Sequence, residues 1–250
     1  MSNETIYPLA QKYLAPIIKR YGRISVVGDN YLPPTGQGAL LACNHSGSFW
    51  WDAMCLIAGL RDRRIQFIAH HWDARIPAIK SVLQMVDCSF LDERLEDITA
   101  DSEVINRLQA GEQMCIYPEE SYHSFRERYT LFKFSPHVAK YAAVAKVPII
   151  PIAVIGAEEA APTLFGLKKA AVPLHIPFHP PLILPVKITL VIGKPIAVDV
   201  SDQLNAGADS ADAGYEAAAE QIRQSLFEMI GHYRNCSLKD EKYIERSSWF

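Results

Sequence analysis

The sequence lacks the features that mark membrane-spanning, secreted and nucleic-acid-binding proteins. No apolar run is long enough to cross a bilayer, and the first residues lack the basic start and apolar core of a signal peptide. The formal net charge of −3 excludes a global electrostatic attraction to nucleic acid. Internal repeats and low-complexity linkers are also missing. These absences favour a single globular domain over residues 1–250, with no transmembrane helix and no nucleic acid partner.

Cysteine is present but follows no functional pattern. The five cysteines are an odd number without C-x-x-C spacing, which argues against a disulfide framework and a thiolate metal site. Cys43, Cys88 and Cys115 lie in apolar, strand-like stretches, so we interpret them as small buried residues in a reducing compartment. His70 and His71 are adjacent, and adjacent side chains on an extended chain point to opposite faces. We therefore expect no bound metal.

Apolar residues alternate between extended and helical patterns along the chain. The expected strands are 23–27, 39–43, 65–69, 113–117, 147–154 and 187–192. The expected helices are 49–60, 74–86, 97–110, 136–146 and 211–233. This alternation predicts an α/β fold, in which helices flank a central, mostly parallel sheet whose strand ends carry the active groups. We divide the chain into an N-terminal amphipathic helix (1–22), a core (23–200) and a C-terminal helix with its tail (201–250).

Some segments allow more than one interpretation. Residues 4–20 have helical spacing of apolar side chains at positions 6, 9, 13 and 17, and two prolines are expected to limit or kink the helix. This helix either covers the core, which we favour, or lies in a membrane interface. Trp50 and Trp51 either contact an acyl chain or the membrane, or pack in the core, and we favour core packing. Residues 157–185 are rich in proline and predict an irregular lobe or a segment that covers a groove.

The strongest chemical signal is a histidine and an acid that lie seven residues apart. The expected strand 39–43 ends in a polar turn with His45, and Asp52 precedes the next apolar run. A carboxylate on one imidazole nitrogen fixes the tautomer, which suits general-base chemistry near neutral pH. Contact requires the chain to fold back, which Gly47 permits, and we expect Ser48 to cap the following helix. The alternative is an ordinary loop histidine near a helix-start acid.

Four segments occur in the order of a known superfamily. They are Asn44-His45 to Asp52, Phe90-Leu91-Asp92-Glu93-Arg94, Tyr117-Pro118-Glu119-Glu120-Ser121 and Val147-Pro148-Ile149-Ile150-Pro151. The series resembles the four blocks of the glycerolipid acyltransferase superfamily, the lysophosphatidate-acyltransferase-like enzymes, over residues 23–200. A mono- and diacylglycerol acyltransferase-like branch is more similar still. It has the same His-to-Asp interval and patterns like Phe125-Arg126-Glu127-Arg128-Tyr129 and Val154-Ile155-Gly156-Ala157-Glu158-Glu159.

The resemblance implies an O-acyltransferase that moves a fatty acyl group from acyl-CoA or acyl carrier protein to a lipid hydroxyl. His45 would be the general base and Asp52 would orient it, without a covalent acyl-enzyme and without a cofactor beyond the thioester. The implied location is peripheral, at the cytoplasmic side of a membrane surface. The implied substrate-binding residues are Asn44, Ser46, Gly47, Arg94, Glu119, Glu120, Ser121, Arg126, Arg128 and Pro148.

Departures from the superfamily pattern bear on the acceptor. The His-to-Asp interval is two residues longer than the commonest one, and Arg94 comes one position late. In the third block Glu120 replaces a glycine, and Tyr122 replaces an arginine that suits a phosphate group. A neutral acceptor hydroxyl therefore fits the sequence better than a lysophosphatidate-type acceptor.

Two other functions stay open from the sequence. One is a non-catalytic lipid-binding protein of the same fold, although such a protein has no need for the pair of His45 and Asp52. The other is a thioesterase or lipid hydrolase, in which water replaces the acceptor. A nucleophile-elbow hydrolase is not expected, because Ser46 does not lie in a G-x-S-x-G pattern.

Overall fold

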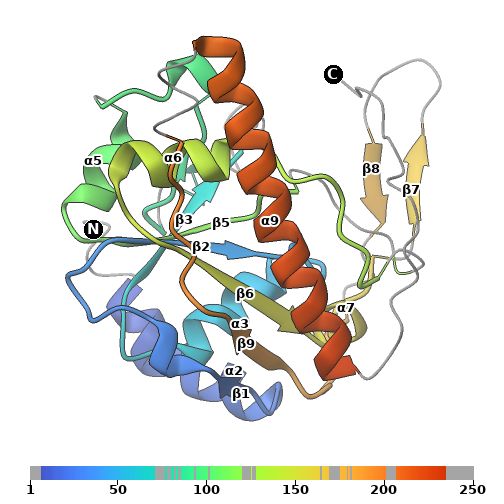
Figure 1. Ribbon diagram of the computed structural model, residues 1–250. Coiled ribbons are helices and arrows are strands. Elements are labelled where there is room, and N and C mark those ends of the chain that lie inside the picture. The colour runs from blue at the N-terminus through green and yellow to red at the C-terminus, as the bar shows by residue number, and fades with distance from the viewer. Residues whose placement is uncertain are drawn as a thin grey trace.

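The computed structural model contains a seven-stranded sheet with helices on both faces (Figure 1). The order of the strands across the sheet is β1-β9-β6-β2-β5-β3-β4. The structure describes residues 7–70, 77, 80, 81, 83, 86–92, 94–100, 102–119, 125, 128–163, 165–168, 175–178, 180, 182–200 and 207–234.

The sheet is mostly parallel, as the alternating pattern predicts. Its strands are β1 (Ser25–Val27), β2 (Ala39–Cys43), β3 (Ile65–Ala69), β4 (Ser89–Phe90), β5 (Gln113–Ile116), β6 (Ile149–Ile155) and β9 (Thr189–Ile192). Strands β6, β2, β5, β3 and β4 run in one direction, whereas β9 is antiparallel to β6 and pairs with β1 in parallel. The carboxyl ends of five strands therefore meet at one edge, and His45 follows β2 there.

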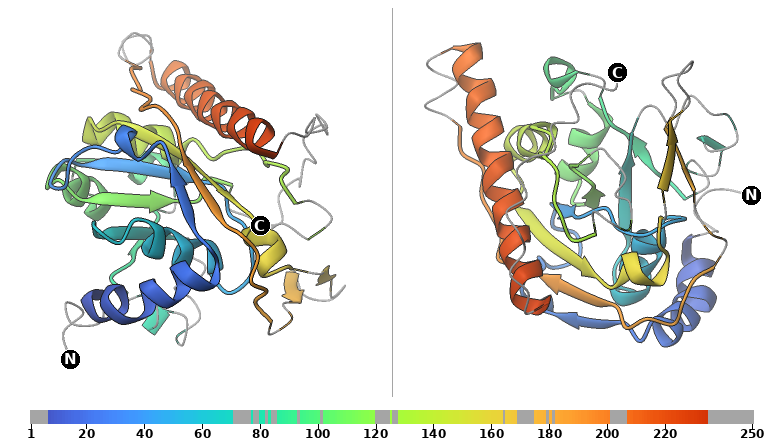
Figure 2. Two further views of the ribbon diagram at one scale, coloured as in Figure 1. Left: turned by 90° about the horizontal axis from the view of Figure 1, so that it is seen from below. Right: turned by 90° about the vertical axis from the view of Figure 1, so that its right-hand side faces the viewer.

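Helices cover both faces because successive strand residues point to opposite sides of the sheet. Leu40 and Ala42 of β2 pack in one apolar cluster, and Leu41 and Cys43 pack in the other. Figure 2 shows α9 across one face of the sheet and the N-terminal helices on the opposite face. The covering helices are α5 (Glu103–Gln109), α6 (His137–Ala145) and α9 (Ala208–Arg234) on one face, and η1 (Ala10–Leu14), α2 (Ala15–Tyr21) and α3 (Trp51–Gly59) on the other.

The expected helix 97–110 is shorter in the structure. The chain forms a 3₁₀ turn, η4 (Leu95–Asp97), in which the Arg94 side chain occupies the cap position, and α5 begins only after Ser102. Serine favours the start of a helix over its interior, because its side chain competes for backbone hydrogen bonds. Much of the expected helix 74–86 lies outside the described residues.

The proline-rich segment 157–185 is less irregular than its composition suggests. It begins with a short helix, α7 (Ala157–Ala160), directly after β6. It also contains a separate two-stranded hairpin of β7 (Phe165–Lys168) and β8 (His175–Phe178), which Figure 1 shows apart from the main sheet. The short helix α7 matters for the site, because its backbone lies against the loop that carries His45.

The N-terminal segment is helical, but the favoured packing of its apolar residues is wrong. Tyr7 and Ala15 are buried, whereas Leu9, Tyr13 and Ile17 are exposed to solvent. The hydroxyl of Tyr7 accepts a hydrogen bond from the Ile65 backbone N–H at 2.9 Å, which anchors the segment to β3. The helix thus has one docked face and a second, exposed apolar face. No helix among the described residues has the length and apolar character needed to cross a membrane.

The predicted burial of the cysteines is confirmed for two of the three residues. Cys43 and Cys115 are fully buried on neighbouring strands, and their sulfur atoms lie 3.4 Å apart as free thiols. Burial raises the pKa of the Cys115 thiol well above its usual value, so this group stays neutral. Cys88 is only half-buried.

Candidate active site

His45 and Asp52 are in direct contact at the carboxyl edge of the sheet. The Nδ1 of His45 lies 2.8 Å from Oδ2 of Asp52, which also accepts the Ser46 backbone N–H at 2.9 Å. The second oxygen of Asp52 accepts the Ala53 N–H at 2.8 Å. Asp52 is fully buried, and the His45 side chain is 11% exposed. The arrangement fixes the Nδ1–H tautomer of His45 and directs Nε2 to receive a proton.

The chain folds back between the two residues through three left-handed positions. Gly47 has φ +86°, as expected for a turn glycine, and Phe49 and Trp50 follow with φ +58° and +53°. The helix α3 begins at Trp51, after Trp50 as its cap residue. The expected cap role of Ser48 is therefore wrong: its hydroxyl pairs with the Thr163 hydroxyl at 3.1 Å. The left-handed pair accommodates the longer His-to-Asp interval.

Two predicted substrate residues instead hold the loop to β6. The side-chain amide of Asn44 donates to the Val154 carbonyl at 3.1 Å and accepts the Val154 N–H at 2.7 Å. Ser46 is buried, and its hydroxyl lies 3.4 Å from the same carbonyl. These polar groups are used within the protein. A Cβ added to Gly47 would lie 2.8 Å from the Ala157 carbonyl oxygen, so this glycine allows the loop to approach α7 closely.

Glu119 also acts on the loop through the backbone. Its carboxylate is 5% exposed and accepts the His45 N–H at 3.2 Å through one oxygen and the Phe132 N–H at 2.9 Å through the other. The acid at the end of β5 thereby joins the loop after β2 to the segment that enters α6. Sequence reasoning places Glu119 at the acceptor, whereas the structure shows it bridging two stretches of main chain.

Sequence reasoning missed Tyr117, the residue beneath the His45 ring. The two ring centroids are 4.6 Å apart with an interplanar angle of 39°. The Tyr117 hydroxyl is buried, and beyond a weak interaction with the Cys115 thiol it has no hydrogen-bond partner among the described residues. Burial, and then the negative charge of Asp52, raise the pKa of Tyr117 well above its usual value. Its position in the sequence could have identified Tyr117 as a site residue, because it directly precedes Pro118 and Glu119 at the end of β5.

A second group brings together, around Tyr129, the two sequence patterns that resemble the mono- and diacylglycerol acyltransferase-like branch. The Tyr129 N–H donates to the Glu158 carboxylate at 2.9 Å, and the Tyr129 hydroxyl contacts Glu159 and accepts the Gly156 N–H at 3.1 Å. Arg234 at the end of α9 lies over the tyrosine ring and pairs with Glu159 at 3.1 Å. These contacts join α7, the segment after Arg128 and the end of α9 into one support for the His45 loop.

The described arginines of the predicted substrate set make local contacts. The Arg94 guanidinium pairs with Glu96 at 2.6 Å and Asp97 at 2.9 Å, and β4 lies three strands away from β2. Arg128 donates to the Phe125 carbonyl at 3.0 Å and lies over the ring of the same residue. The structure therefore brings neither guanidinium into contact with His45.

Pro148 lies at the opposite end of the sheet. Its carbonyl accepts the Leu40 N–H at 3.0 Å, and Leu40 opposes Ile149 in the register of β2 with β6. His45 lies five residues after Leu40 along a largely extended chain, a span of roughly 16 Å. Glu120, Ser121 and Arg126 lie outside the described residues.

The described part of the chain contains no group of three histidine, cysteine, aspartate or glutamate side chains arranged for a metal ion. His70 belongs to this part, whereas its neighbour His71 lies outside it.

Comparisons with known proteins identify the family and the fold. The sequence profile of a family described as Acyltransferase matches residues 23–155, the part that contains β1 to β6 and the His45 loop. A crystal structure of the 1-acyl-sn-glycerophosphate (LPA) acyltransferase PlsC from Thermotoga maritima superposes with a TM-score of 0.51 and 17% identity, over 88% of this chain and 82% of that one. At this identity, the similarity shows a shared fold.

Similar sequences occur in mycobacteria. Uncharacterized protein ML2427 of Mycobacterium leprae is 26% identical over 252 residues, which cover 91% of this chain. Uncharacterized protein Rv0502 of Mycobacterium tuberculosis is 28% identical over 238 residues, which cover 87% of this chain. The matched region spans 65% and 64% of the length of these two relatives.

Proposed function

Because this chain belongs to the acyltransferase family, we propose that it is an O-acyltransferase that moves a fatty acyl group from an acyl thioester to a lipid hydroxyl. The observation that carries the proposal is the 2.8 Å contact between His45 Nδ1 and the buried carboxylate of Asp52. A binding protein gains nothing from a buried charge that fixes one histidine tautomer. A general base gains a fixed tautomer and a stabilised imidazolium from that arrangement.

The chemistry follows from the orientation of the imidazole. His45 Nε2 takes the proton of the acceptor hydroxyl while its oxygen attacks the thioester carbonyl carbon. The negative Asp52 stabilises the imidazolium that forms. The carbon–sulfur bond then breaks, the thiolate leaves, and His45 returns its proton to the sulfur. The products are an ester and a free thiol of coenzyme A or acyl carrier protein, and no further cofactor is required.

A neutral hydroxyl, as in a mono- or diacylglycerol, is our preferred acceptor over a phosphorylated one. The superfamily arginine that suits a phosphate is Tyr122 here. Arg94 is already paired with Glu96 and Asp97, and Arg128 is held by Phe125. Bringing either guanidinium to a phosphate would first break these contacts.

We also propose that the protein works at the surface of a membrane, where such an acceptor is found. The exposed apolar face of η1 and α2 supports this location. Residues 7–28 carry Lys12, Lys19, Arg20 and Arg23 but no acidic residue, so the segment is positively charged throughout. Cationic, apolar helices of this kind bind to anionic lipid surfaces.

The test is acyl transfer by the purified protein. Labelled acyl-CoA or acyl carrier protein thioester is supplied with monoacylglycerol, diacylglycerol, lysophospholipids and lysophosphatidate. The matched variants are His45→Ala and His232→Ala, a histidine on α9 whose ring packs on its neighbour Tyr233. An acylated lipid formed by wild type and His232→Ala but not by folded His45→Ala supports the proposal. Free fatty acid as the sole product indicates a hydrolase, and no turnover with any donor indicates a lipid-binding protein.

A further inference from the structure

The left-handed stretch in the His45 loop exposes two aromatic side chains. Phe49 and Trp50 are 43% and 39% exposed, whereas Trp51, the next residue, is 4% exposed. The favoured core packing is therefore correct for Trp51 and wrong for Trp50. A left-handed conformation costs a non-glycine residue roughly 1–2 kcal/mol, so the surroundings must hold this stretch in place. The loop is held by Ser48, whose N–H donates to the Ala161 carbonyl at 2.6 Å.

Other exposed apolar side chains gather around this pair. Nine of the eleven large apolar side chains that are exposed in the described part of the chain come from three segments. These residues are Leu9, Tyr13, Leu14, Ile17 and Tyr21 of the N-terminal helices, Phe49 and Trp50 of the His45 loop, and Leu182 and Leu184. We call this set the apolar rim.

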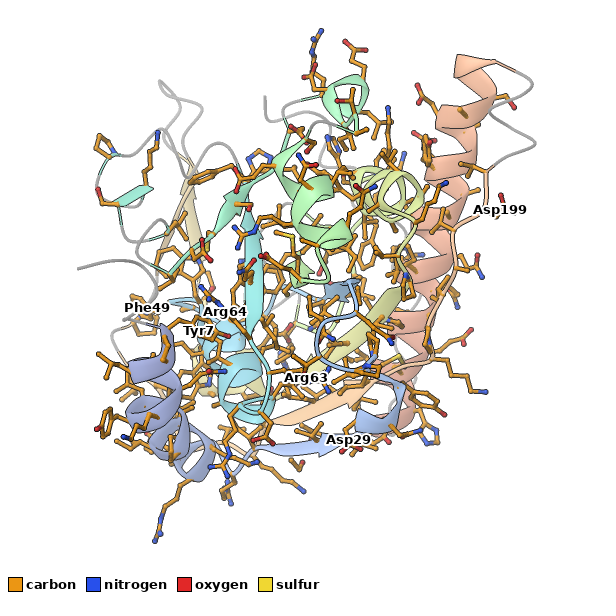
Figure 3. The ribbon with its side chains drawn as sticks, turned by 90° about the vertical axis from the view of Figure 1, so that its left-hand side faces the viewer. Tyr7, Asp29, Phe49, Arg63, Arg64 and Asp199 are labelled. Atoms are coloured by element: carbon orange, nitrogen blue, oxygen red, sulfur yellow. The ribbon has the colours of Figure 1, made fainter. Side chains whose placement is uncertain are left out.

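Direct contacts link the three segments of the apolar rim. The Tyr21 ring meets the Trp51 ring edge-on at 6.4 Å, and the Tyr21 hydroxyl donates to the Ile183 carbonyl at 2.6 Å. The Leu184 N–H donates to the Ala160 carbonyl at 2.7 Å, one residue from the carbonyl that holds Ser48. Figure 3 shows Phe49 and Tyr7 at the edge of the molecule that carries the N-terminal helices, away from Asp199 and α9. Tyr21 and the stretch 182–184 are thus direct neighbours of the segments that hold the His45 loop, and the exposed residues of η1 and α2 lead up to Tyr21.

The positive charge of this surface favours a negatively charged partner. Ile17, Tyr21 and the two cations Arg20 and Arg23 line an open hollow together with Pro185. Because residues 7–28 contain no acid, no local carboxylate of this segment offsets these cations. Tryptophan and tyrosine favour the interface between water and hydrocarbon, and each basic residue near an anionic lipid surface adds about 1 kcal/mol of attraction.

We propose that Phe49 and Trp50 dock into the interfacial layer of an anionic lipid bilayer, beside the exposed face of η1 and α2. The two residues by which the His-to-Asp interval exceeds the commonest length then serve as an anchor for the His45 loop. Docking places His45 at the depth of the lipid headgroups, where an acceptor hydroxyl lies. This last consequence rests on the proposed acyl transfer, whereas bilayer binding by the aromatic pair does not.

The test is binding of the full chain to vesicles of phosphatidylcholine with phosphatidylglycerol, measured by co-sedimentation without substrate. The double variant Phe49→Asn/Trp50→Asn removes both rings, and asparagine tolerates the left-handed conformation better than most residues. We expect the double variant to bind the vesicles at least about tenfold more weakly than wild type does. The control is Tyr233→Asn, which removes an equally exposed ring from α9 and should bind like wild type. Equal binding by wild type and the double variant would overturn the proposal, as would equal weakening by the control.

A second measurement reports depth and does not depend on the stability of the double variant. Lipids with brominated acyl chains quench tryptophans that enter the bilayer, and Trp50→Phe removes the relevant fluorophore while keeping an aromatic ring. Wild type should lose a larger fraction of its fluorescence than Trp50→Phe does. An identical fraction in both proteins would place Trp50 outside the bilayer and contradict docking.

The two proposals fail in different ways. A wild-type protein that binds vesicles through the aromatic pair but transfers no acyl group retains the docking and loses the enzymatic function. A protein that transfers acyl groups but binds vesicles equally with and without the pair retains the function and loses the docking. Self-association that the double variant abolishes, with unchanged vesicle binding, would assign the pair to a contact between two copies of the chain.

Discussion

Glu119 accepts the backbone N–H of His45, not its imidazole. The 3.2 Å contact joins the end of β5 to the His45 loop after β2, while the other carboxylate oxygen accepts the Phe132 N–H at 2.9 Å. An ionised carboxylate is the one side chain of this size that accepts through both ends. Glu119 therefore positions His45 through the main chain, and its contribution is measurable as stability.

Glu119→Gln should lower the free energy of unfolding by about 1–3 kcal/mol, because one amide end presents a donor to a buried backbone donor. Urea unfolding of the variant and of wild type measures this difference. Glu228→Gln provides the control, since this glutamate lies on the exposed side of α9. A Glu119→Gln midpoint equal to that of wild type would mean that the two backbone contacts contribute nothing.

Asp52→Asn should lower kcat by about 10²- to 10⁴-fold while leaving the KM for the acceptor within a few-fold. The amide keeps the shape of the side chain but removes the charge that stabilises the His45 imidazolium. Steady-state kinetics with the acceptor identified in the transfer assay gives both parameters. Asp212→Asn on α9 should behave like wild type. A raised KM with unchanged kcat would instead make Asp52 a substrate-binding residue.

Gly47→Ala should destabilise the protein more than Gly36→Ala does. Both glycines have similar left-handed conformations, with φ +86° and +89°, so both variants incur the same backbone cost of about 1–2 kcal/mol. A Cβ at Gly47 would lie 2.8 Å from the Ala157 carbonyl oxygen, whereas a Cβ at Gly36 meets no atom within 4 Å. The difference between the two unfolding free energies isolates the contact with α7. Equal losses would show that the loop does not press on that helix.

Tyr117→Phe should make the protein less sensitive to alkaline pH. The pKa of Tyr117 is raised in the folded state, mainly by burial and then by Asp52. A tyrosine in the unfolded chain has a pKa of about 10. The buried, neutral Tyr117 therefore contributes fully to the stability of wild type below this pH, and the contribution is lost as pH rises above it. Between about pH 8 and pH 11, the midpoint temperature of thermal unfolding should fall less steeply with pH for Tyr117→Phe than for wild type or for the control Tyr233→Phe. Identical slopes would contradict a buried, neutral Tyr117.

The same variant tests the buried hydroxyl of Tyr117 at neutral pH. Among the described residues this hydroxyl has no partner stronger than the Cys115 thiol, so its removal should leave stability unchanged or raise it by up to about 1 kcal/mol. A clear loss of stability would mean that the hydroxyl makes a favourable contact.

The local pattern of apolar residues was sufficient to predict most strands and helices of the fold. The apolar run Ala39–Cys43 is a buried strand with the predicted bounds, because a short run of this kind has few other ways to bury every side chain. The sequence also allowed the contact between His45 and Asp52, since a turn glycine between them lets the chain reverse. Helix boundaries were less accurate, as at Ser102, after which α5 begins with Glu103, whereas the expected helix 97–110 begins earlier.

The rest depended on the tertiary structure. The sequence by itself determined an α/β protein with a mostly parallel sheet, and it placed a histidine and an acid seven residues apart after one strand without deciding that they touch. It did not determine the partners of Glu119 and Asn44, because those partners are backbone groups that any residue type supplies. Nor did it determine that Trp50 is exposed beside a buried Trp51. That outcome depends on two left-handed residues, which hold their conformation only because α7 and β6 fix the loop on either side.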